Sequence, residues 1–348
     1  MKKILHVILI SLFSLTIISC AKKSSSSSSD TTDTTVESCT TTTTDTTTQM
    51  GGSRQGVELC LSTVVTTLAG TGSSGSANGT GTSASFYAPS GITTDGTNLY
   101  VVDYGNHLIR QIVISTGVVT TLAGTGSSGS ADNSTGTSAS FYYPTGITTD
   151  GTNLYVADYY NHLIRKIVIS TGVVTTLAGT GSSGSADNST GTSAGFNQPY
   201  GITTDGTNLY VADYGNHLIR KIVISTGVVT TVAGTGSSGS ANGTGTSASF
   251  NYPAGITTDG TNLYVADRYN YLIRKIVIST GVVTTVAGTG SSGSANGTGT
   301  SASFDKPYGV TTDGTNLYVA DYYNHLIRKI VISTGVVTTV AGTGSSGS

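Results

Sequence analysis

The sequence is poor in charge. Lys, Arg, Asp and Glu together make up 10% of its 348 residues, and the formal net charge is −2. Basic residues are spread along the chain and form no stripe. Domains that bind nucleic acid concentrate Lys and Arg on one face or along one helix. We therefore expect no nucleic-acid partner.

Long hydrophobic runs are also scarce, and the one at residues 4–18 follows two lysines. It is too short for a comfortable membrane span and ends at a small residue, which is typical of a secretory signal. Ile-Ile-Ser-Cys at 17–20 resembles a bacterial lipobox, in which the cysteine is lipidated. We predict a lipoprotein signal peptide over 1–19 and a lipid anchor on Cys20, with ordinary cleavage near Cys20 as the alternative. The expected location is the bacterial cell envelope, periplasmic or surface-exposed.

Residues 20–55 are rich in Ser and Thr and have almost nothing apolar to bury. Such a composition predicts a disordered tether. Besides Cys20 the chain has only Cys39 and Cys60. In an exported protein this pair is predicted to form a disulfide between the tether and the first repeat, with two separate thiols as the alternative.

The remaining chain is repetitive. Asn-His-Leu-Ile-Arg, or once Asn-Tyr-Leu-Ile-Arg, recurs at spacings of 55 or 54 residues. The copies are Asn106–Arg110, Asn161–Arg165, Asn216–Arg220, Asn270–Arg274 and Asn324–Arg328. A fixed period of this length indicates stacked supersecondary units. The pentapeptide resembles the NHL repeat family, and the longer unit over residues 56–348 resembles its bacterial teneurin-type version. The resemblance implies an all-β fold, a β-propeller, and leaves the function open.

One repeat can be divided into strands. Residues 91–94 are short and small, as expected beside a propeller axis. Residues 99–103 and 108–115 are nearly continuously apolar, which predicts middle strands buried on both faces. Residues 118–122 are rich in Thr and suit an outer strand. The repeat is thus predicted to form one blade of four antiparallel strands.

The number of blades has two interpretations. Residues 58–67 align with the third and fourth strands of a repeat, and five complete repeats follow. These two strands could complete a sixth blade with first and second strands from the other end, which would remove exposed strand edges. We favour this six-blade geometry, incomplete as written; a five-bladed ring with a strand pair left over is the alternative.

Candidate catalytic residues are few. The only glutamates, Glu37 and Glu58, lie outside the five repeats. The repeat histidines are expected to be structural, although they could converge on a metal; they are His107, His162, His217 and His325. Recurring Asp and Arg of the Asp103 and Arg110 type are expected to hold each blade together. We predict no cofactor, no metal and no catalytic site, with a propeller lactonase or lyase carrying a channel metal as the alternative.

Comparison of the repeats locates a candidate site. The residues that differ lie mostly in the loop between blades and in the turn between the second and third strands, whereas the Asp-Gly-Thr-Asn turns are invariant. In an antiparallel blade the two variable segments emerge on the same face. The candidate ligand-binding residues are Tyr87, Tyr104, Tyr143, Tyr160, Gln198, Tyr200, Tyr214, Tyr252, Arg268, Tyr269, Lys306, Tyr308 and Tyr323.

Tyrosine combines a large contact area with a polar tip at low entropic cost. We therefore predict a lipid-anchored binding scaffold that presents this Tyr-rich face to a protein or a glycan. Drift in exposed loops is the competing interpretation.

Overall fold

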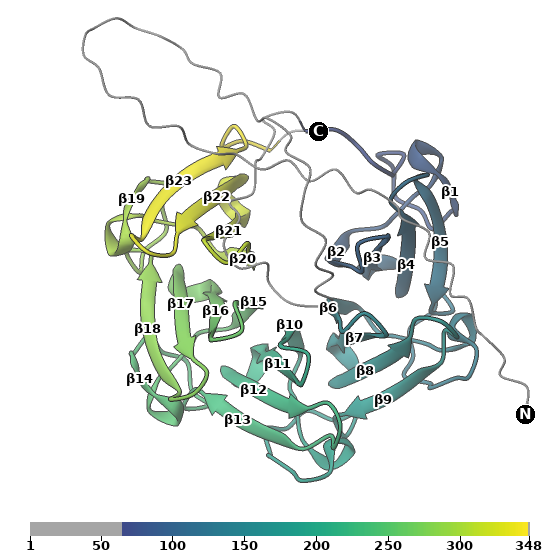
Figure 1. Ribbon diagram of the computed structural model, residues 1–348, viewed down its shortest axis with the longest axis horizontal. Helices are drawn as coiled ribbons and strands as arrows, with labels where there is room; N and C mark the ends of the chain where they lie inside the picture. Colours follow the sequence, from purple (N-terminus) through teal and green to yellow (C-terminus); the bar gives the residue numbers. More distant parts are fainter. Residues whose placement is uncertain (1–64, 347–348) are drawn as a thin grey trace, which may run out of the picture.

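The computed structural model describes residues 65–346. The predicted signal peptide and tether, with Cys20, Cys39 and Cys60, lie outside these residues. The described chain forms five antiparallel sheets arranged around one axis as the blades of a propeller (Figure 1). Its helices are short 3-10 turns, and none of those described is long and apolar enough to cross a membrane.

In each blade the strands follow one another outward from the axis. Blade 1 contains β2 (Pro89–Thr94), β3 (Asn98–Asp103), β4 (Leu108–Val113), β5 (Val118–Ala123) and the short edge strand β1 (Gly79–Thr80). Blade 2 contains β6 (Pro144–Thr149), β7 (Asn153–Asp158), β8 (Leu163–Val168) and β9 (Val174–Ala178). Blade 3 contains β10 (Pro199–Thr204), β11 (Asn208–Asp213), β12 (Leu218–Val223) and β13 (Val229–Ala233). Blade 4 contains β15 (Pro253–Thr258), β16 (Asn262–Asp267), β17 (Leu272–Val277), β18 (Val282–Ala287) and β14 (Gly243–Thr244). Blade 5 contains β20 (Pro307–Thr312), β21 (Asn316–Asp321), β22 (Leu326–Val331), β23 (Val336–Ala341) and β19 (Gly297–Thr298).

Two kinds of 3-10 turn recur. A Gly-Thr-Ser turn precedes each blade, in η1 (Gly81–Ser83), η3 (Gly136–Ser138), η5 (Gly191–Ser193), η7 (Gly245–Ser247) and η9 (Gly299–Ser301). The other connects the second and third strands, in η2 (Tyr104–Asn106), η4 (Tyr159–Asn161), η6 (Tyr214–Asn216), η8 (Arg268–Asn270) and η10 (Tyr322–Asn324).

The predicted four-strand blade is confirmed, with two differences. The third strand ends at Val113 rather than residue 115, because the Thr116 and Gly117 N–H groups already turn back to the Val113 carbonyl. The outermost strand of blades 1, 4 and 5 pairs with a further two-residue strand, so these sheets have five strands. Two residues of Gly-Thr carry no strand pattern that a sequence could reveal.

The core lies between the blades. At the junction of blades 1 and 2, Tyr100 and Ile109 pack with Phe141 and Ile147 of the next blade. Equivalent clusters join each later pair of blades. The phenylalanines from Phe141 onward are fully buried, each stabilising the fold by roughly 1.5–3 kcal/mol, as expected for core residues.

Inner strands approach so closely that only glycine fits. A Cβ on Gly146 of β6 would lie 2.4 Å from the carbonyl oxygen of Tyr200 in β10. Gly91, Gly201 and Gly255 make the same approach to the following blade. At Gly309, in blade 5, the nearest atom within 4 Å is instead Ala320 Cβ at 3.7 Å, which belongs to the same blade.

Within each blade a buried ion pair joins strands to loop. In blade 3 the Arg220 Nη1 donates to Asp213 Oδ2 at 2.8 Å, and both side chains are fully buried. The same Nη1 donates to the Gly195 carbonyl at 2.8 Å, and the guanidinium lies 5.0 Å from the Phe196 ring centroid. All five blades contain this pair, which confirms the predicted role of the Asp103 and Arg110 types.

The arc of described blades is open between blade 5 and blade 1 (Figure 1). Ile92 of β2 is 58% exposed, whereas its counterpart Ile147 is 6% exposed. Ile327 of β22 is 42% exposed, whereas its counterpart Ile273 is fully buried. The two end faces thus expose the surface that interior blades bury against each other. The structure contains five blades, and a sixth stays a prediction that these faces favour.

Replacing Arg220 with Met should lower the free energy of unfolding by about 3–5 kcal/mol, because Asp213 is left buried without its counter-charge. The double variant Arg220→Met/Asp213→Asn should be less destabilised, since no uncompensated charge is buried. Chemical denaturation measures both. The control is Lys221→Gln, a residue that blade 1 already carries as Gln111. A loss below about 1 kcal/mol in the single variant would show that the pair does not hold the blade.

Extending the chain after Ser348 by about 30 residues of repeat sequence, through a second strand ending Leu-Tyr-Val-Ala-Asp, should raise thermal stability and reduce aggregation. The reason is burial of the Ile92 and Ile327 faces. Calorimetry and light scattering measure the effect, with a scrambled extension of equal length as control. If the extension leaves the melting temperature unchanged, and the chain without the extension is monomeric, a ring of five blades is favoured.

Candidate functional site

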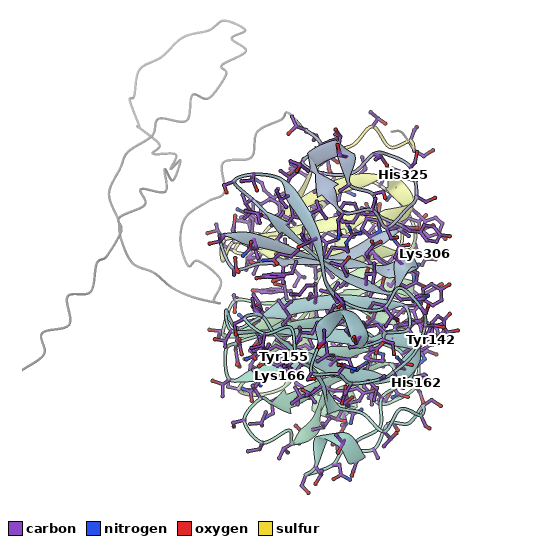
Figure 2. The ribbon with its side chains drawn as sticks, turned by 90° about the vertical axis from the view of Figure 1, so that its right-hand side faces the viewer. Tyr142, Tyr155, His162, Lys166, Lys306 and His325 are labelled. Carbon is purple, nitrogen blue, oxygen red and sulfur yellow. The ribbon has the colours of Figure 1, made fainter. Side chains whose placement is uncertain are left out.

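The variable segments of each repeat meet on one face. The Gly105 N–H, in the turn after the second strand, donates to the Tyr87 carbonyl in the loop between blades at 2.8 Å. The Tyr269 N–H donates likewise to Asn251 at 3.1 Å. Figure 2 shows Tyr142, His162, Lys306 and His325 toward one side of the molecule, with Tyr155 toward the other. The prediction that both segments share a face is confirmed, and we call this face the tyrosine rim.

The buried ion pairs position the rim. In blade 1, Asp103 Oδ1 accepts the Tyr87 N–H at 2.7 Å, and Asp103 Oδ2 accepts the Asn106 side-chain amide at 2.8 Å. The same Oδ2 is paired with Arg110. One carboxylate therefore holds both the loop and the turn that carry the variable residues, and this arrangement recurs in every blade.

Three of the repeat histidines link neighbouring blades. His107 ends its turn in the left-handed conformation, with φ of 56°, and its Nδ1 accepts the Tyr143 N–H at 3.0 Å. His162 and His217 accept the N–H groups of Gln198 and Tyr252 in the same way. Burial lowers the pKa of each of these three histidines, which favours the neutral ring that can accept. Their expected structural role is confirmed. Within residues 65–346 no three His, Cys, Asp or Glu side chains are grouped as metal ligands.

Rim tyrosines form a continuous series of ring contacts. From blade 1 to blade 4, neighbouring rings lie 4.7–6.2 Å apart between centroids. The series runs through Tyr104, Tyr143, Tyr160, Tyr159, Tyr214, Tyr252 and Tyr269. Ring pairs at such separations prefer tilted or edge-to-face geometries, which most of these adopt.

Tyr200 of blade 3 and Tyr308 of blade 5 meet across blade 4. Their hydroxyl groups are hydrogen-bonded and their ring centroids lie 5.0 Å apart. The corresponding residue of blade 4 is the small, fully buried Ala254. Burial raises the pKa of Tyr308, and the nearby Tyr104, Tyr322 and Tyr159 hydroxyls act in the same direction. These tyrosines from several blades therefore converge where the axis reaches the rim, and we call this place the axial mouth.

Arg268 breaks the series of tyrosines. The first residue of the equivalent turn is Tyr in the other four repeats. The Arg268 Nη1 donates to the Tyr214 hydroxyl at 3.2 Å, and its Cζ lies 4.7 Å from the Tyr308 ring centroid. A second cation, Lys306, places Nζ 4.3 Å from the Tyr323 ring centroid.

The candidate residues divide by exposure. Five of them are solvent-exposed, namely Tyr87, Tyr160, Tyr252, Tyr269 and Tyr323. Seven are half-buried, namely Tyr104, Tyr143, Gln198, Tyr200, Arg268, Lys306 and Tyr308, and Tyr214 is buried. Tyr214 is the least accessible of the candidates, and its ring contacts those of Tyr200 and Tyr252. The role of all these residues in binding stays a prediction. Exposed Tyr142 and Tyr322 were not among the candidates, although each stands beside one that was.

A hollow of ≈ 320 Å³ opens on the rim at blades 1 and 2. Tyr87, Tyr104, Tyr143 and Tyr160 line it together with Ala88 and Gly105. The hollow exists because Gly105 stands where blades 2, 4 and 5 have Tyr, and Gly105 packs directly on the Tyr87 ring.

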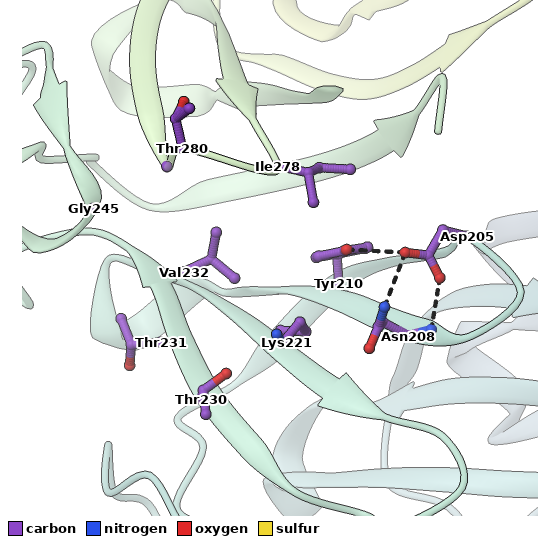
Figure 3. A pocket seen from close by; sticks show the side chains of 11 residues that line it. Asp205, Asn208, Tyr210, Lys221, Thr230, Thr231, Val232, Gly245, Ile278 and Thr280 are labelled. Carbon is purple, nitrogen blue, oxygen red and sulfur yellow. Dashed lines mark hydrogen bonds between the residues drawn. The ribbon is translucent and has the colours of Figure 1, made fainter. Parts of the chain in front are cut away.

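A second cleft, of ≈ 410 Å³, lies between blades 3 and 4 away from the rim (Figure 3). Asp205 there accepts hydrogen bonds from the Tyr210 hydroxyl at 3.0 Å and from the Asn208 amide groups (Figure 3). These bonds hold the pKa of Asp205 below its usual value although burial acts to raise it. The lining residues recur from repeat to repeat, so this cleft belongs to the frame of the propeller.

Comparisons with known proteins agree with this architecture. Residues 141–167 match the NHL repeat model. The chain is 29% identical over 303 residues to NHL repeat-containing protein 2 of Gallus gallus, covering 76% of this chain and 42% of that protein. It is 30% identical over 283 residues to the chloroplastic protein SUPPRESSOR OF QUENCHING 1 of Arabidopsis thaliana, covering 76% of this chain and 27% of that one. The chain thus spans less than half the length of these relatives.

A solved structure described as a nidogen/laminin complex is similar in fold, with a TM-score of 0.52. The match covers 72% of this chain and 80% of that chain at 17% identity, so it concerns the fold alone. The repeats, the blades and the likeness to NHL proteins agree. The chain belongs to the NHL repeat family of β-propellers.

Proposed function

We propose that this propeller is a binding scaffold that presents its tyrosine rim to a protein or a glycan. The observation that carries the proposal is the distribution of differences between repeats. Most residues that differ gather on the rim, whereas the Asp-Gly-Thr-Asn turns on the opposite face are the same in all five repeats. The loop before each Gly-Thr-Ser turn also differs, with Asn78 and Gly79 in blade 1 where blade 2 has Asp132, Asn133 and Ser134.

The frame and the rim consist of different residues, which vary differently between repeats, and this supports the proposal. The buried Asp–Arg pair within the blade, the phenylalanine and the inner-strand glycine recur in every repeat. The rim residues differ from blade to blade and include exposed Tyr87, Tyr160 and Tyr269. Tyr and Arg are the residues that most often carry binding energy in interfaces. A rigid support with a variable aromatic face suits recognition of an extended ligand.

We further propose that the scaffold is anchored in the bacterial cell envelope through a lipid on Cys20. The lipobox-like sequence at 17–20 and the Ser- and Thr-rich segment that follows it support this location. Such a tether would hold the rim away from the membrane surface.

Replacing Tyr252, Arg268 and Tyr269 together with Ala should weaken binding by roughly 100-fold or more, with little change in melting temperature. Ala is compatible with the backbone at 252, because Ala88 adopts the same positive φ in blade 1. Glycan arrays and pull-downs of the mature protein, run in parallel with the variant, measure the effect.

The control is Thr261→Ala with Asn262→Ala, in the opposite turn, where Asn262 donates to Asp259. This change should reduce stability and leave binding intact at temperatures where the fold persists. The proposed function would be contradicted if the triple variant retained ligands as well as the wild type does. It would also be contradicted if the wild type captured no ligand.

Cys20→Ala should release the protein from membranes and abolish its labelling with radioactive fatty acid, because the thiol that accepts the lipid is gone. Cys39→Ala is the matched control and should remain labelled and membrane-bound. Membrane fractionation and fatty-acid labelling in a bacterial host are the measurements. An unlabelled wild type that fractionates like Cys20→Ala would exclude the lipid anchor.

A further inference from the structure

We infer that the axial mouth binds an acidic saccharide, with the Arg268 guanidinium as the group that receives its negative charge. This inference rests on the proposed binding function and specifies its ligand class. It starts from Arg268, the one cation at a position that is Tyr in the other repeats.

Arg268 differs from every other arginine of residues 65–346 in its charge balance. Each of the other five forms a buried ion pair with an Asp of its own blade. Arg268 forms no ion pair with the described residues, and its described hydrogen bond goes to the neutral Tyr214 hydroxyl. Its Nε is buried without a hydrogen-bond partner in the described part of the chain. The blade arginines share that last feature, so the missing carboxylate is the distinguishing one.

The surroundings of Arg268 strengthen a charged contact. Its Cζ lies 4.7 Å from the Tyr308 ring centroid and 5.3 Å from that of Tyr269, and the side chain is half-buried. A guanidinium held between rings keeps its planar fork of donors oriented, and that fork matches the two oxygens of a carboxylate. A partly desolvated site also weakens screening by salt relative to open surface.

Lys306 extends the positive region. Its Nζ lies 5.3 Å from the Tyr269 ring centroid, on the same ring that Arg268 contacts. The blade 3 counterpart of Lys306 is the neutral Gln198. One carboxylate is nearby in sequence, that of Asp305, and it forms no ion pair with either cation in the described structure. The cations of the mouth are therefore available to a ligand.

The remaining chemistry of the rim favours a sugar over an acidic peptide. Proteins receive acidic peptides along a free strand edge, in an apolar groove or on a cluster of arginines. At the mouth the strand ends are covered by turns, and Arg268 is the single arginine there among the described residues. The exposed ring of Tyr252 instead presents a surface that attracts the C–H groups of a pyranose, with a hydroxyl tip for its oxygens. The tyrosine-lined hollow at blades 1 and 2 provides a second, uncharged place for a sugar ring.

The test uses the full chain and a panel of oligogalacturonate, oligoglucuronate and sulfated oligosaccharides, with carboxyl-reduced forms of the first two. Calorimetry should detect binding of an acidic member and much weaker binding of its neutral counterpart. Arg268→Tyr should weaken that binding by about tenfold or more, because a charge-assisted hydrogen bond is lost. Lys306→Gln should weaken it less, and added salt should weaken it further.

Arg268→Tyr restores the residue of the other repeats, and Lys306→Gln copies blade 3, so both variants should fold. The matched control is Lys275→Gln, which removes one positive charge from β17 and copies Gln111 of blade 1. Melting temperatures equal to that of the wild type show that the variants differ in binding and not in stability.

The outcomes separate this inference from the proposed function. Preference for carboxylated over sulfated sugars, or the reverse, identifies the acidic group while upholding the inference. If the rim captures neutral glycans or proteins and Arg268→Tyr has no effect on that binding, the inference is overturned. The proposed binding function is then still supported. A Glu-rich peptide that binds as well as the oligosaccharides would also overturn it. No capture of any glycan or protein would overturn both.

Discussion

The buried Asp–Arg pair is the interaction on which the rest of this propeller depends. In blade 1 the Asp103 carboxylate is paired with Arg110 and accepts from the Tyr87 backbone and the Asn106 side chain. Arg110 in turn donates to carbonyl groups of the loop that enters the blade. A buried ion pair is weak evidence for net stability, since its desolvation cost is large. Its value here lies in geometry: one pair fixes the position of two loops relative to the sheet. The buried pair therefore sets the position of the rim segments.

Because each blade repeats this frame, the other repeats show which residues the frame accepts at each position. The position of Arg268 is Tyr in four repeats, and that of Lys306 is Ala, Tyr or Gln elsewhere, on backbones of the same conformation. These comparisons show that the blade backbone is compatible with other residues at both positions. Ala254 illustrates how such differences shape the mouth, since Tyr200 and Tyr308 meet across blade 4, where the corresponding residue is small. The mouth thus depends on differences between repeats, and an array of identical blades would not build it.

Much of this was predictable from sequence because repetition reveals period, strand order and the two faces. The repeat length predicted stacked units, the resemblance of the pentapeptide to NHL repeats implied the propeller, and the variable positions predicted the rim. Exposure of single side chains was not predictable: Tyr214 is buried and Tyr322 is exposed, although each is the first residue of the turn after a second strand. That outcome depends on ring contacts between residues far apart in the chain, such as Tyr200 and Tyr308. The histidines were expected to be structural, but their acceptance of a backbone N–H from the next blade follows only from the angle between blades.

This histidine contact also bears on the open side of the ring. His107, His162 and His217 each receive an N–H from the blade that follows, at 3.0 Å. His325 stands at the same point of blade 5 and is exposed. Ile327, next to it in β22, is exposed where its counterparts are buried, and Gly309 lacks the close carbonyl that Gly255 meets. Three independent positions of blade 5 therefore have the form of an interior blade. In blade 2 the loop residue Tyr143 contacts His107 and Tyr104 of the preceding blade, so the loop of a further blade would meet His325 and Tyr322.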